Sequence, residues 1–259
     1  MSGRTCALVT GASSGIGLEI STVLAREGYD LVLVARRSDE LEQLRAVLSA
    51  SYGVTVRVLI ADLSRYGSAE EIRARLREFG VHIRVLVNNA GIGGFGPFDE
   101  GDPELYERMI AVNVSAVTGL TRMLLPEMIQ RGAGKILNIA SVAAFQPGPL
   151  MAVYYATKAY VLSLSEALAR ELSGSGVTVT ALCPGPTRSE FHDRAGIPVG
   201  AAANARTIAE IGVRAMVSGR RIVVPGALFR LFIFASRFLP RRSIAALVHR
   251  AQRARLRHR

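Results

Sequence analysis

The stretch Thr10-Gly11-Ala12-Ser13-Ser14-Gly15-Ile16-Gly17 follows a short apolar run and opens a segment with helical periodicity. Glycines let a backbone turn approach a pyrophosphate closely, and the start of the helix offers unpaired N–H groups and a positive dipole end to it. Three glycines alone would also suit a tight turn. Their place between a strand and a helix favours a dinucleotide site. The residues assigned to this site are Gly11, Ser13, Ser14, Gly15, Ile16 and Gly17.

Six further apolar runs of strand length alternate with longer stretches of helical periodicity. Runs such as Leu31-Val32-Leu33-Val34 show no polar alternation, which predicts strands covered by helices on both faces. The sequence therefore predicts an α/β fold with a doubly wound, Rossmann-type parallel sheet of about seven strands. The predicted strands are 6–10, 30–35, 54–60, 83–87, 135–140, 177–182 and 221–224.

Signals for helix ends agree with this alternation. Ser38 is predicted to cap a helix that starts at Asp39, and Asp102-Pro103 combines an N-cap residue with a proline in the first turn. Gly28 suits the C-terminal end of the first helix.

Composition limits the class of protein. The 259 residues are 49% hydrophobic and 20% charged, which is enough apolar material for one large core. Cys6 and Cys183 lie inside apolar runs and are expected to be small buried hydrophobes rather than a disulfide. The four histidines have no metal-ligand spacing, so no metal site is expected. The N-terminus lacks the long apolar core of a signal peptide, and we expect a cytoplasmic protein.

The net charge of +11 is concentrated near the C-terminus. Residues 211–259 hold twelve arginines and neither Asp nor Glu, whereas acidic and basic residues nearly balance before them. Arginine outnumbers lysine 30 to 2. A lysine at a given position, Lys135 or Lys158, therefore indicates that its ammonium is needed there.

The G-x-x-x-G-x-G spacing departs from the common G-x-G-x-x-G fingerprint. It is the first of seven ordered features in which about 225 residues resemble the short-chain dehydrogenase/reductase family. The other six are Asp62-Leu63, Asn88-Asn89-Ala90-Gly91, Asn113, Ser141, Tyr154-Tyr155-Ala156-Thr157-Lys158 and Pro184-Gly185-Pro186-Thr187. The resemblance predicts one Rossmann-fold oxidoreductase domain over residues 1–225. Residues 226–259 are expected to form an apolar and then Arg-rich helical extension.

Tyr154 and Lys158 are four residues apart and share one face of the predicted helix, where the ammonium can lower the pKa of the phenol from about 10. A core tyrosine beside a surface lysine would give the same pattern. The presence of a lysine here, in a chain that otherwise uses arginine almost throughout, favours the functional interpretation, because a guanidinium cannot replace a compact ammonium. Tyr155 is expected to point about 100° away and to act as packing or pocket wall.

The resemblance implies an enzyme that interconverts a ketone or aldehyde and an alcohol by hydride transfer, with Tyr154 as general acid and base. It implies that Ser141 hydrogen-bonds the substrate oxygen, that Lys158 also holds the nicotinamide ribose, and that Asn113 supports a water relay to this lysine. From the residues alone, Ser141 could be a turn serine and Asn113 could bond a neighbouring backbone.

Cofactor choice depends on the end of the second strand, where an acid would accept the ribose hydroxyls of NAD and an arginine would pair with a 2′-phosphate. Ala35-Arg36-Arg37 has no acid there and resembles the NADP(H)-preferring members, although arginines also begin solvated helices. Asp62 is expected near the adenine, or else as a cap of its turn. The other cofactor contacts that the resemblance implies are Leu63, Asn89, Ala90, Gly91, Pro184, Gly185 and Thr187, with Tyr154 and Lys158.

The substrate loop is expected between Pro184 and about Ile208, where the small apolar residues 196–201 suggest a hydrophobic ketone, fatty-acyl or steroid-like. The apolar segment from Leu228 to Leu239 is about 12 residues long, too short to span a bilayer that needs ~20. With the arginines after it, the segment fits a peripheral contact with an anionic membrane, or else a cover over the substrate cleft or a subunit interface. Nucleic acid is a poorer candidate partner for the Arg-rich tail, because no nucleic-acid-binding motif accompanies its positive charge.

The family resemblance also implies that the protein forms a homo-oligomer. Two other functions remain open at this point: a catalytically silent NADP(H)-binding regulator, and a membrane-surface scaffold. The complete set of Asn113, Ser141, Tyr154 and Lys158 argues against the silent regulator, while the scaffold stays open.

Overall fold

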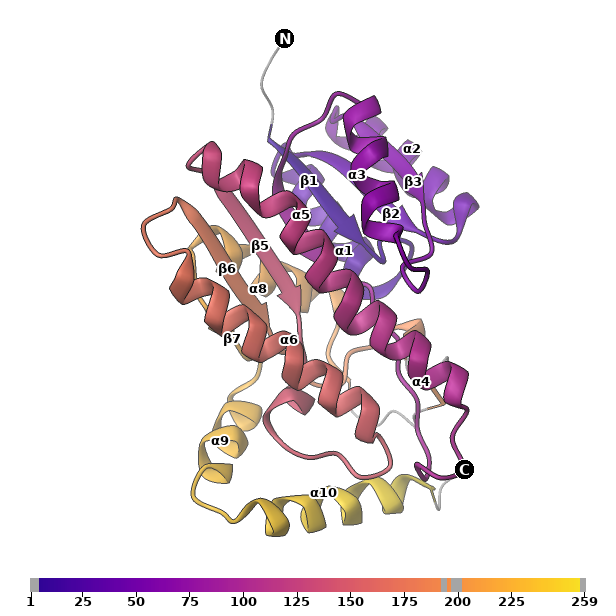
Figure 1. The fold of residues 1–259 in the computed structure, drawn as a ribbon, viewed down its shortest axis with the longest axis vertical. Coiled ribbons are helices and arrows are strands. Elements are labelled where there is room, and N and C mark those ends of the chain that lie inside the picture. Colours follow the sequence, from indigo (N-terminus) through magenta and orange to yellow (C-terminus); the bar gives the residue numbers. More distant parts are fainter. Residues whose placement is uncertain (1–4, 192–194, 197–201, 257–259) are drawn as a thin grey trace.

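The computed structural model describes residues 5–191, 195–196 and 202–256. At its centre is a seven-stranded parallel sheet with the order β3-β2-β1-β4-β5-β6-β7 (Figure 1). The predicted doubly wound fold is confirmed, and each strand end lies within two residues of its predicted position. The strands are β1 Cys6–Thr10, β2 Asp30–Ala35, β3 Val56–Ile60, β4 Ile83–Asn88, β5 Gly134–Ile139, β6 Val177–Leu182 and β7 Ile222–Val223.

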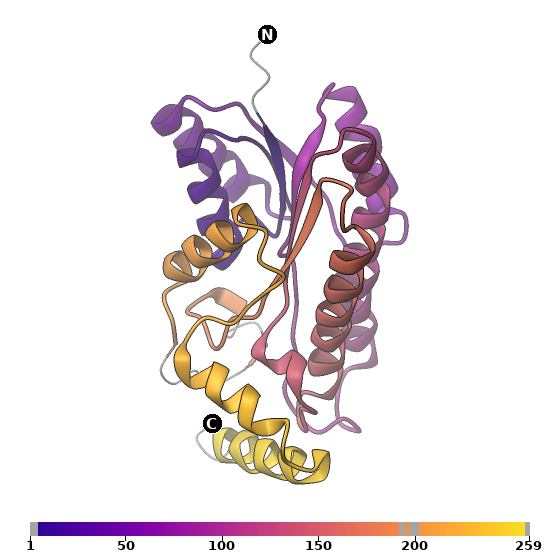
Figure 2. The ribbon, with the colours of Figure 1, turned by 90° about the vertical axis from the view of Figure 1, so that its left-hand side faces the viewer.

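Helices cover both faces of the sheet, as Figure 2 shows. One face packs against α1 (Gly15–Arg26), α2 (Ser38–Tyr52) and α8 (Ala205–Val217). The other face packs mainly against α3 (Ser68–Glu78), α5 (Ala116–Gln130) and α6 (Ala152–Glu171). Consecutive residues of one strand therefore enter different cores: Leu31 and Leu33 belong to the first, Val32 and Val34 to the second. This arrangement is the physical reason for the uninterrupted apolar runs.

The helix-end predictions were partly right. Asp102 caps α4 (Pro103–Ile110) by accepting a hydrogen bond from the N–H of Glu104 at 2.9 Å. Gly28 takes a left-handed conformation just after α1, with φ of 83°. The predicted cap at Ser38 is wrong, because Ser38 is itself the first residue of α2 and no side chain caps that helix.

The long helical segment Pro103–Gln130 combines α4, a π-helical turn at Ala111–Ser115 and α5. By length and apolar character alone it could cross a membrane. It packs against the sheet instead, with Leu120, Leu124 and Met128 buried in the second core, which identifies it as a core helix.

The chain order places a crevice at the carboxyl ends of the strands. From β1 the chain proceeds outward through β2 and β3, and then returns to β4 on the other side of β1. Connections that diverge in this way leave a crevice between neighbouring strands, the usual ligand position in such sheets. The glycine-rich turn follows β1, and the Asn89-Ala90-Gly91 segment follows β4, so both motifs meet there.

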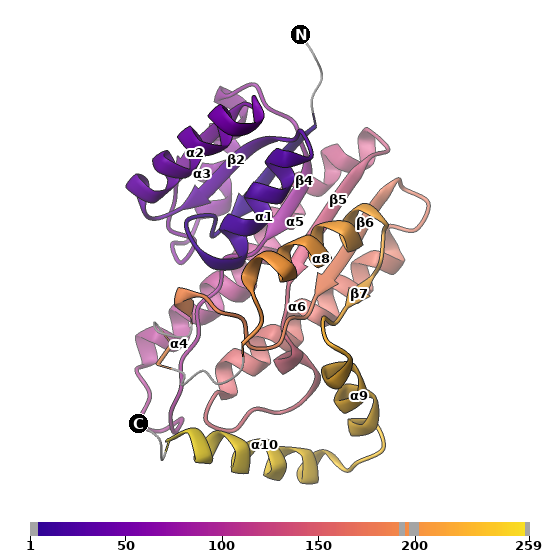
Figure 3. The ribbon, with the colours of Figure 1, turned by 180° about the vertical axis from the view of Figure 1, so that it is seen from behind.

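The C-terminal extension is helical, as predicted, and consists of α9 (Ala227–Ser236) and α10 (Arg241–Leu256). Both helices lie across the end of the molecule toward which the strands point (Figures 1 and 3). The inward stripe of α10, Ile244, Val248 and Gln252, is at most 8% exposed. The extension therefore contributes to the wall of the same crevice.

Candidate active site

A cavity of about 1120 Å³ occupies the carboxyl end of the sheet. Its walls come from the turns after β1, β2, β3, β4, β5 and β6, and from the inner sides of α9 and α10. Apolar surface predominates on the side of α9 and α10, where Phe229, Phe232 and Val248 line it. Segments that are far apart in the sequence thus form one site.

The glycine turn forms one end of the cavity. Gly11 and Gly15 have φ angles of 64° and 56°, which side chains rarely adopt. A Cβ added at Gly17 would lie 2.3 Å from the carbonyl oxygen of Gly11 and 2.3 Å from Asn89 Nδ2. Gly17 does not line the cavity, and instead lets the helix start pack under the turn. The backbone N–H groups at the start of α1 thereby remain at the cavity.

Asn89 fixes this turn to β4. Its Nδ2 donates to the carbonyl oxygens of Thr10 and Gly11 at 2.9 and 3.2 Å. The N–H groups of Asn89 and Ala90 both donate to Thr10 Oγ1 at 3.0 Å. Asn89, Ala90 and Gly91, which the sequence assigns to the cofactor, line the cavity, and the amide of Asn89 holds the turn in place through hydrogen bonds.

Arg36 and Arg37 differ in their surroundings, although both line the cavity. The guanidinium of Arg37 forms salt bridges with Glu40 at 2.9 Å and Glu190 at 3.0 Å, and donates to Ser13 Oγ at 3.2 Å. Arg36 is exposed, and within the described ranges no carboxylate forms a salt bridge with it. Arg36 is therefore the arginine more available to an anion.

Asp62 accepts hydrogen bonds from the N–H and the Oγ of Ser64, so it caps the turn after β3 and also lines the cavity. Burial alone would raise the pKa of Asp62, but these hydrogen bonds and the charges of Arg36 and Arg65 outweigh burial and lower the pKa. The carboxylate is thus kept ionised beside Arg36. Its neighbour Leu63 is buried and lines the same wall.

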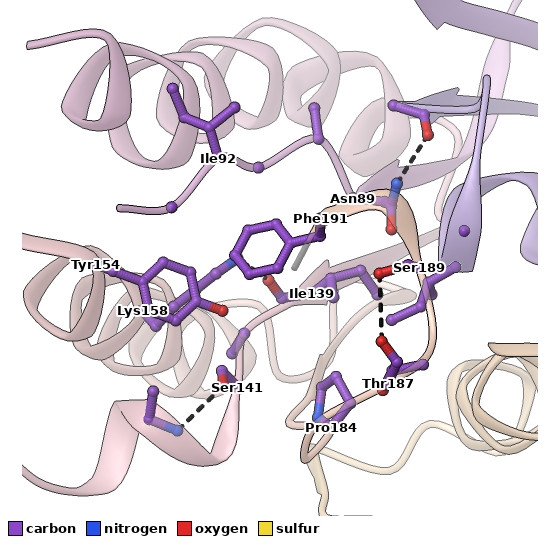
Figure 4. Close-up of a pocket in the computed structure, with 18 of the residues that line it drawn as sticks. Asn89, Ile92, Ile139, Ser141, Tyr154, Lys158, Pro184, Thr187, Ser189 and Phe191 are labelled. Atoms are coloured by element: carbon purple, nitrogen blue, oxygen red, sulfur yellow. Dashed lines mark hydrogen bonds between the residues drawn. The ribbon is translucent and has the colours of Figure 1, made fainter. Parts of the chain in front are cut away.

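Tyr154 and Lys158 lie one turn apart near the start of α6 and both reach the cavity (Figure 4). The Nζ atom of Lys158 donates to the carbonyl oxygen of Ile139 at 2.8 Å and lies 5.8 Å from the centre of the Tyr154 ring. Ser141 accepts a hydrogen bond from the N–H of Ala143 at 3.1 Å and also bonds to Tyr154. Ser141 is therefore both a turn cap and a neighbour of the tyrosine.

Burial dominates the ionisation of this pair. It raises the pKa of Tyr154 to about 12, although a hydrogen bond from Ser141 acts against the rise. It lowers the pKa of Lys158 to about 8. The expectation that Lys158 lowers the pKa of Tyr154 is wrong here, because the ammonium bonds the Ile139 carbonyl and burial has the larger effect. At neutral pH the tyrosine holds its proton and the lysine is mostly charged.

Asn113 lies in the π-helical turn at Ala111–Ser115, behind the cavity wall rather than on it. Its Oδ1 accepts from the N–H of Ile92 at 2.9 Å. Its Nδ2 donates to the carbonyl oxygen of Ile92 at 2.9 Å and to Thr157 Oγ1 at 3.0 Å. Asn113 thus joins the segment after β4 to α6 one residue before Lys158, which makes it a positioning residue.

The loop after β6 closes another side of the cavity. Pro184, Gly185 and Thr187, which the sequence assigns to the cofactor, line it, and Thr187 Oγ1 donates to the carbonyl oxygen of Gly185 at 3.0 Å. Phe191 follows on the same loop, with its ring centre 5.4 Å from that of Tyr154 (Figure 4). The small apolar residues 197–201 of the predicted substrate loop lie outside the described residues, as do His192, Arg257, His258 and Arg259.

Sequence reasoning missed the contacts made by the extension. Gln252 of α10 is 4% exposed, and its Nε2 donates to the hydroxyl of Tyr155 at 3.2 Å. Phe229 of α9 packs against Gly185, where an added Cβ would lie 2.4 Å from the ring. Tyr155 is a pocket wall, as predicted. Apolar periodicity alone did not distinguish a helix that covers a cleft from one that faces a lipid surface.

Within residues 5–191, 195–196 and 202–256, no group of three or more His, Cys, Asp or Glu side chains could hold a metal ion. Cys6 and Cys183 are free and buried in separate core clusters.

Comparisons with known proteins agree with this geometry. Residues 5–196 match the family model described as short chain dehydrogenase. A very-long-chain 3-oxoacyl-CoA reductase from Anas platyrhynchos is 37% identical over 184 residues, which cover 69% of this chain and 58% of that protein. The match thus spans less than two thirds of the relative's own length.

Solved structures extend the similarity to most of the chain. A short-chain dehydrogenase from Sphingobium yanoikuyae in complex with NADPH has a TM-score of 0.83 and 38% identity, covering 90% of this chain and 93% of that one. A bulky-bulky ketone specific alcohol dehydrogenase from Comamonas testosteroni has a TM-score of 0.79 and 33% identity, covering 90% and 92%.

Proposed function

The chain belongs to the short-chain dehydrogenase/reductase family of oxidoreductases, and we propose that it interconverts a ketone or aldehyde and an alcohol with NADP(H). Tyr154 is the general acid and base. The observation that carries this proposal is the convergence of Tyr154, Lys158 and Ser141 on a cavity that also contains the glycine turn. A tyrosine that keeps its proton beside a charged lysine suits proton donation to an oxygen.

The residues present fit a dinucleotide. Gly11 and Gly15 leave a cradle without side chains, and added Cβ atoms at Gly11 and Gly17 would meet backbone atoms at 2.9 and 2.3 Å. The start of α1 offers N–H groups suited to a pyrophosphate. We assign the dinucleotide to this cradle, the walls made by Asp62 and Asn89, and the region of Lys158. The bound cofactor would supply the hydride.

The chain's own groups would then act on the carbonyl oxygen. Tyr154 donates its hydroxyl proton to that oxygen during reduction, and takes the proton back during oxidation. Ser141 donates a hydrogen bond to the same oxygen and stabilises the negative charge that develops on it. Lys158 holds the nicotinamide ribose and keeps a positive charge beside the phenol. Asn113 positions this lysine indirectly, by joining the backbone of Ile92 to the side chain of Thr157, the residue before it.

The preference for NADP(H) rests on Arg36. Position 35, at the end of β2, carries Ala35 rather than an acid, and Arg36 lines the cavity without a salt-bridge partner in the described ranges. A 2′-phosphate would give this guanidinium a charge-assisted hydrogen bond. The NADPH complex of the Sphingobium yanoikuyae relative supports the same choice.

The substrate is proposed to be a hydrophobic carbonyl compound. Met151, Phe191, Phe229 and Phe232 give the cavity beside Tyr154 an apolar wall. The Comamonas testosteroni relative is named for bulky ketones, and the Anas platyrhynchos relative for a very-long-chain 3-oxoacyl group. We further propose a homo-oligomer that works in the cytoplasm.

A screen of carbonyl classes would test the function. The protein is mixed with NADPH and, in turn, small aldehydes, bulky aryl ketones, steroid ketones and 3-oxoacyl thioesters, and NADPH loss is followed by absorbance. Tyr154→Phe is the control for background oxidation. Turnover of an apolar ketone that is lost in the control supports the proposal. NADPH binding without turnover of any class would instead favour the silent regulatory protein.

A further inference from the structure

Large apolar side chains are exposed on α9, on α10 and on the turn between them. Leu228, Leu231 and Phe234 on α9, and Phe238 just after it, follow one another at intervals of three or four residues and are 57–76% exposed. The rings of Phe234 and Phe238 are 5.3 Å apart and form one raised patch. With Leu239 at 50% and Leu247 at 51% exposed, these six residues form what we call the outer apolar face.

Positive charge surrounds this face. Arg230, Arg237, Arg241, Arg242, Arg250 and Arg253 lie on the same two helices and are all exposed. Residues 226–259 contain neither Asp nor Glu. Within the described ranges, no salt bridge involves any of the six arginines. The extension thus presents apolar side chains and unneutralised cations together.

We propose that the outer apolar face docks on an anionic lipid bilayer, with its Leu and Phe side chains in the headgroup boundary and its arginines among lipid phosphates. Amphipathic helices that combine aromatic residues with arginine bind such surfaces through apolar burial and charge attraction. Two exposed helices at one end of the molecule can meet a flat surface together (Figures 1 and 2).

Charge complementarity argues against a second copy of the chain as the occupant. A two-fold interface brings the same patch of both subunits together, so arginine-rich surfaces without acids would face each other. Nucleic acid would neutralise the arginines, but it would leave the raised Phe234 and Phe238 pair without an apolar partner. An anionic bilayer satisfies both the charge and the apolar surface.

The docked helices also form a wall of the cavity. Phe229 and Phe232 of α9 line it from the inner side, and Leu228 belongs both to the cavity lining and to the outer apolar face. Only one helix, about 10 Å thick, separates the cavity from the proposed lipid surface. Resting on the proposed function, this geometry makes carbonyl compounds dissolved in the bilayer the substrate class.

Co-sedimentation with lipid vesicles tests the docking. The full chain is incubated with vesicles of phosphatidylcholine alone and with phosphatidylglycerol added, at low and high salt. We expect binding to the anionic vesicles at low salt, little binding to neutral ones, and loss at high salt, because the Debye length falls from ~30 Å at about 0.01 M to ~3 Å at about 1 M. Tyr154→Phe should bind as the parent does, so this measurement is independent of turnover.

Two variants test the two parts of the face. Phe234→Ser/Phe238→Ser removes exposed rings, and Arg241→Gln/Arg242→Gln removes two charges. Each should weaken binding to anionic vesicles about tenfold or more, with NADPH affinity and melting temperature unchanged. The matched controls are Val47→Ser on α2 and Arg73→Gln/Arg77→Gln on α3, which change exposed residues elsewhere and should bind like the parent.

The outcomes are distinguishable. A full chain that stays in the supernatant with anionic vesicles at low salt overturns the proposal. Equal loss of binding in the α3 control overturns the role of this face, and dissociation of an oligomer by Phe234→Ser/Phe238→Ser without vesicle binding identifies a subunit interface instead. If the enzyme is active, Phe234→Ser/Phe238→Ser should slow reduction of a vesicle-dissolved ketone and leave a water-soluble aldehyde unaffected. Equal effects on both substrates would overturn the proposal that substrates come from the bilayer, but not the proposal that the outer apolar face docks on it.

Discussion

The ammonium nitrogen of Lys158 lies 5.8 Å from the centre of the Tyr154 ring, within a site buried enough to change the ionisation of both groups. The pKa of Lys158 falls to about 8 and that of Tyr154 rises to about 12. At neutral pH the tyrosine is therefore protonated and the lysine is mostly positively charged. A protonated phenol is the form that can donate a proton.

The pH dependence of cofactor capture should report Lys158. As pH rises through about 8, the lysine loses its proton and with it the charge that holds the ribose. We expect kcat/KM for NADPH, which reports the free enzyme, to be about tenfold lower at pH 9 than at pH 7. Tyr154 remains protonated throughout this range, because its pKa is about 12. A profile that stays flat from pH 7 to pH 9.5 would contradict the assignment.

Tyr154→Phe should abolish most turnover and spare cofactor binding. The substitution keeps the ring that packs against Phe191 and removes only the transferable proton, so a loss of about 100- to 10,000-fold in kcat is expected. Tyr155→Phe is the matched control. It loses the hydrogen bond from Gln252 and keeps Tyr154 intact, so it should change kcat far less. Steady-state kinetics together with an NADPH binding titration would check both variants. Near-normal turnover in Tyr154→Phe would contradict the role of Tyr154 as general acid and base.

Arg36→Ala should weaken NADPH binding and leave NADH binding almost unchanged. A charge-assisted hydrogen bond to a phosphate is worth about 1.5–3 kcal/mol, or roughly 10- to 150-fold in Kd. Arg37→Ala is the contrast, because Arg37 is held by Glu40, Glu190 and Ser13 and should affect the two cofactors alike. Titrating both variants with both cofactors separates these roles. Equal affinity of the parent protein for NADPH and NADH would refute the assignment.

Much of the fold could be predicted because it depends on local patterns. Strands buried on both faces must be apolar throughout, as in Leu31-Val32-Leu33-Val34, and the glycines after β1 are required by backbone geometry. The site could be predicted in part for the same reason, since Tyr154 and Lys158 are one helical turn apart. Ser141 reaches them from the turn after β5, and only the ordered family features indicated it.

What the sequence did not predict depends on contacts between distant segments. Burial around Lys158 combines β5, α6 and the segment after β4, so the direction of the Tyr154 pKa could not be read from a four-residue spacing. Gln252 lies 97 residues after Tyr155, and nothing local in an Arg-rich helix marks it as a pocket residue. The apolar segment at α9 gave two interpretations because it has two apolar sides.

Gly17→Ala should destabilise the protein and weaken cofactor binding. The added Cβ would lie 2.3 Å from the backbone oxygen of Gly11, which cannot rotate away, so the turn must shift. Overpacking of this kind costs about 1–3 kcal/mol, and the hydrogen bonds from Asn89 would be strained as well. Gly119→Ala is the control, since its Cβ meets only the side chain of Ala69, at 3.1 Å. Melting temperature and NADPH affinity are the measurements, and an unchanged Gly17→Ala protein would contradict the packing argument.

Gln252→Ala should change substrate selection without changing the chemistry. Gln252 is buried, donates to the Tyr155 hydroxyl at 3.2 Å and contacts the sulfur of Met151 at 3.5 Å, so it closes the end of the cavity formed by α10. Removing it loses a hydrogen bond and opens space, which should cost about 1–2 kcal/mol of stability.

Gln252 lies at the end of the cavity formed by α10 and donates to the pocket-wall residue Tyr155, so NADPH affinity and kcat for a small aldehyde should remain those of the parent. The KM for a bulky apolar ketone should change several-fold, since the ketone occupies the wall that has been altered. Arg253→Ala is the control, because Arg253 is the next residue on α10 and is exposed. If Gln252→Ala reduced NADPH affinity and small-aldehyde turnover together, α10 would support the whole fold rather than select the substrate, and its assignment as a pocket wall would be wrong.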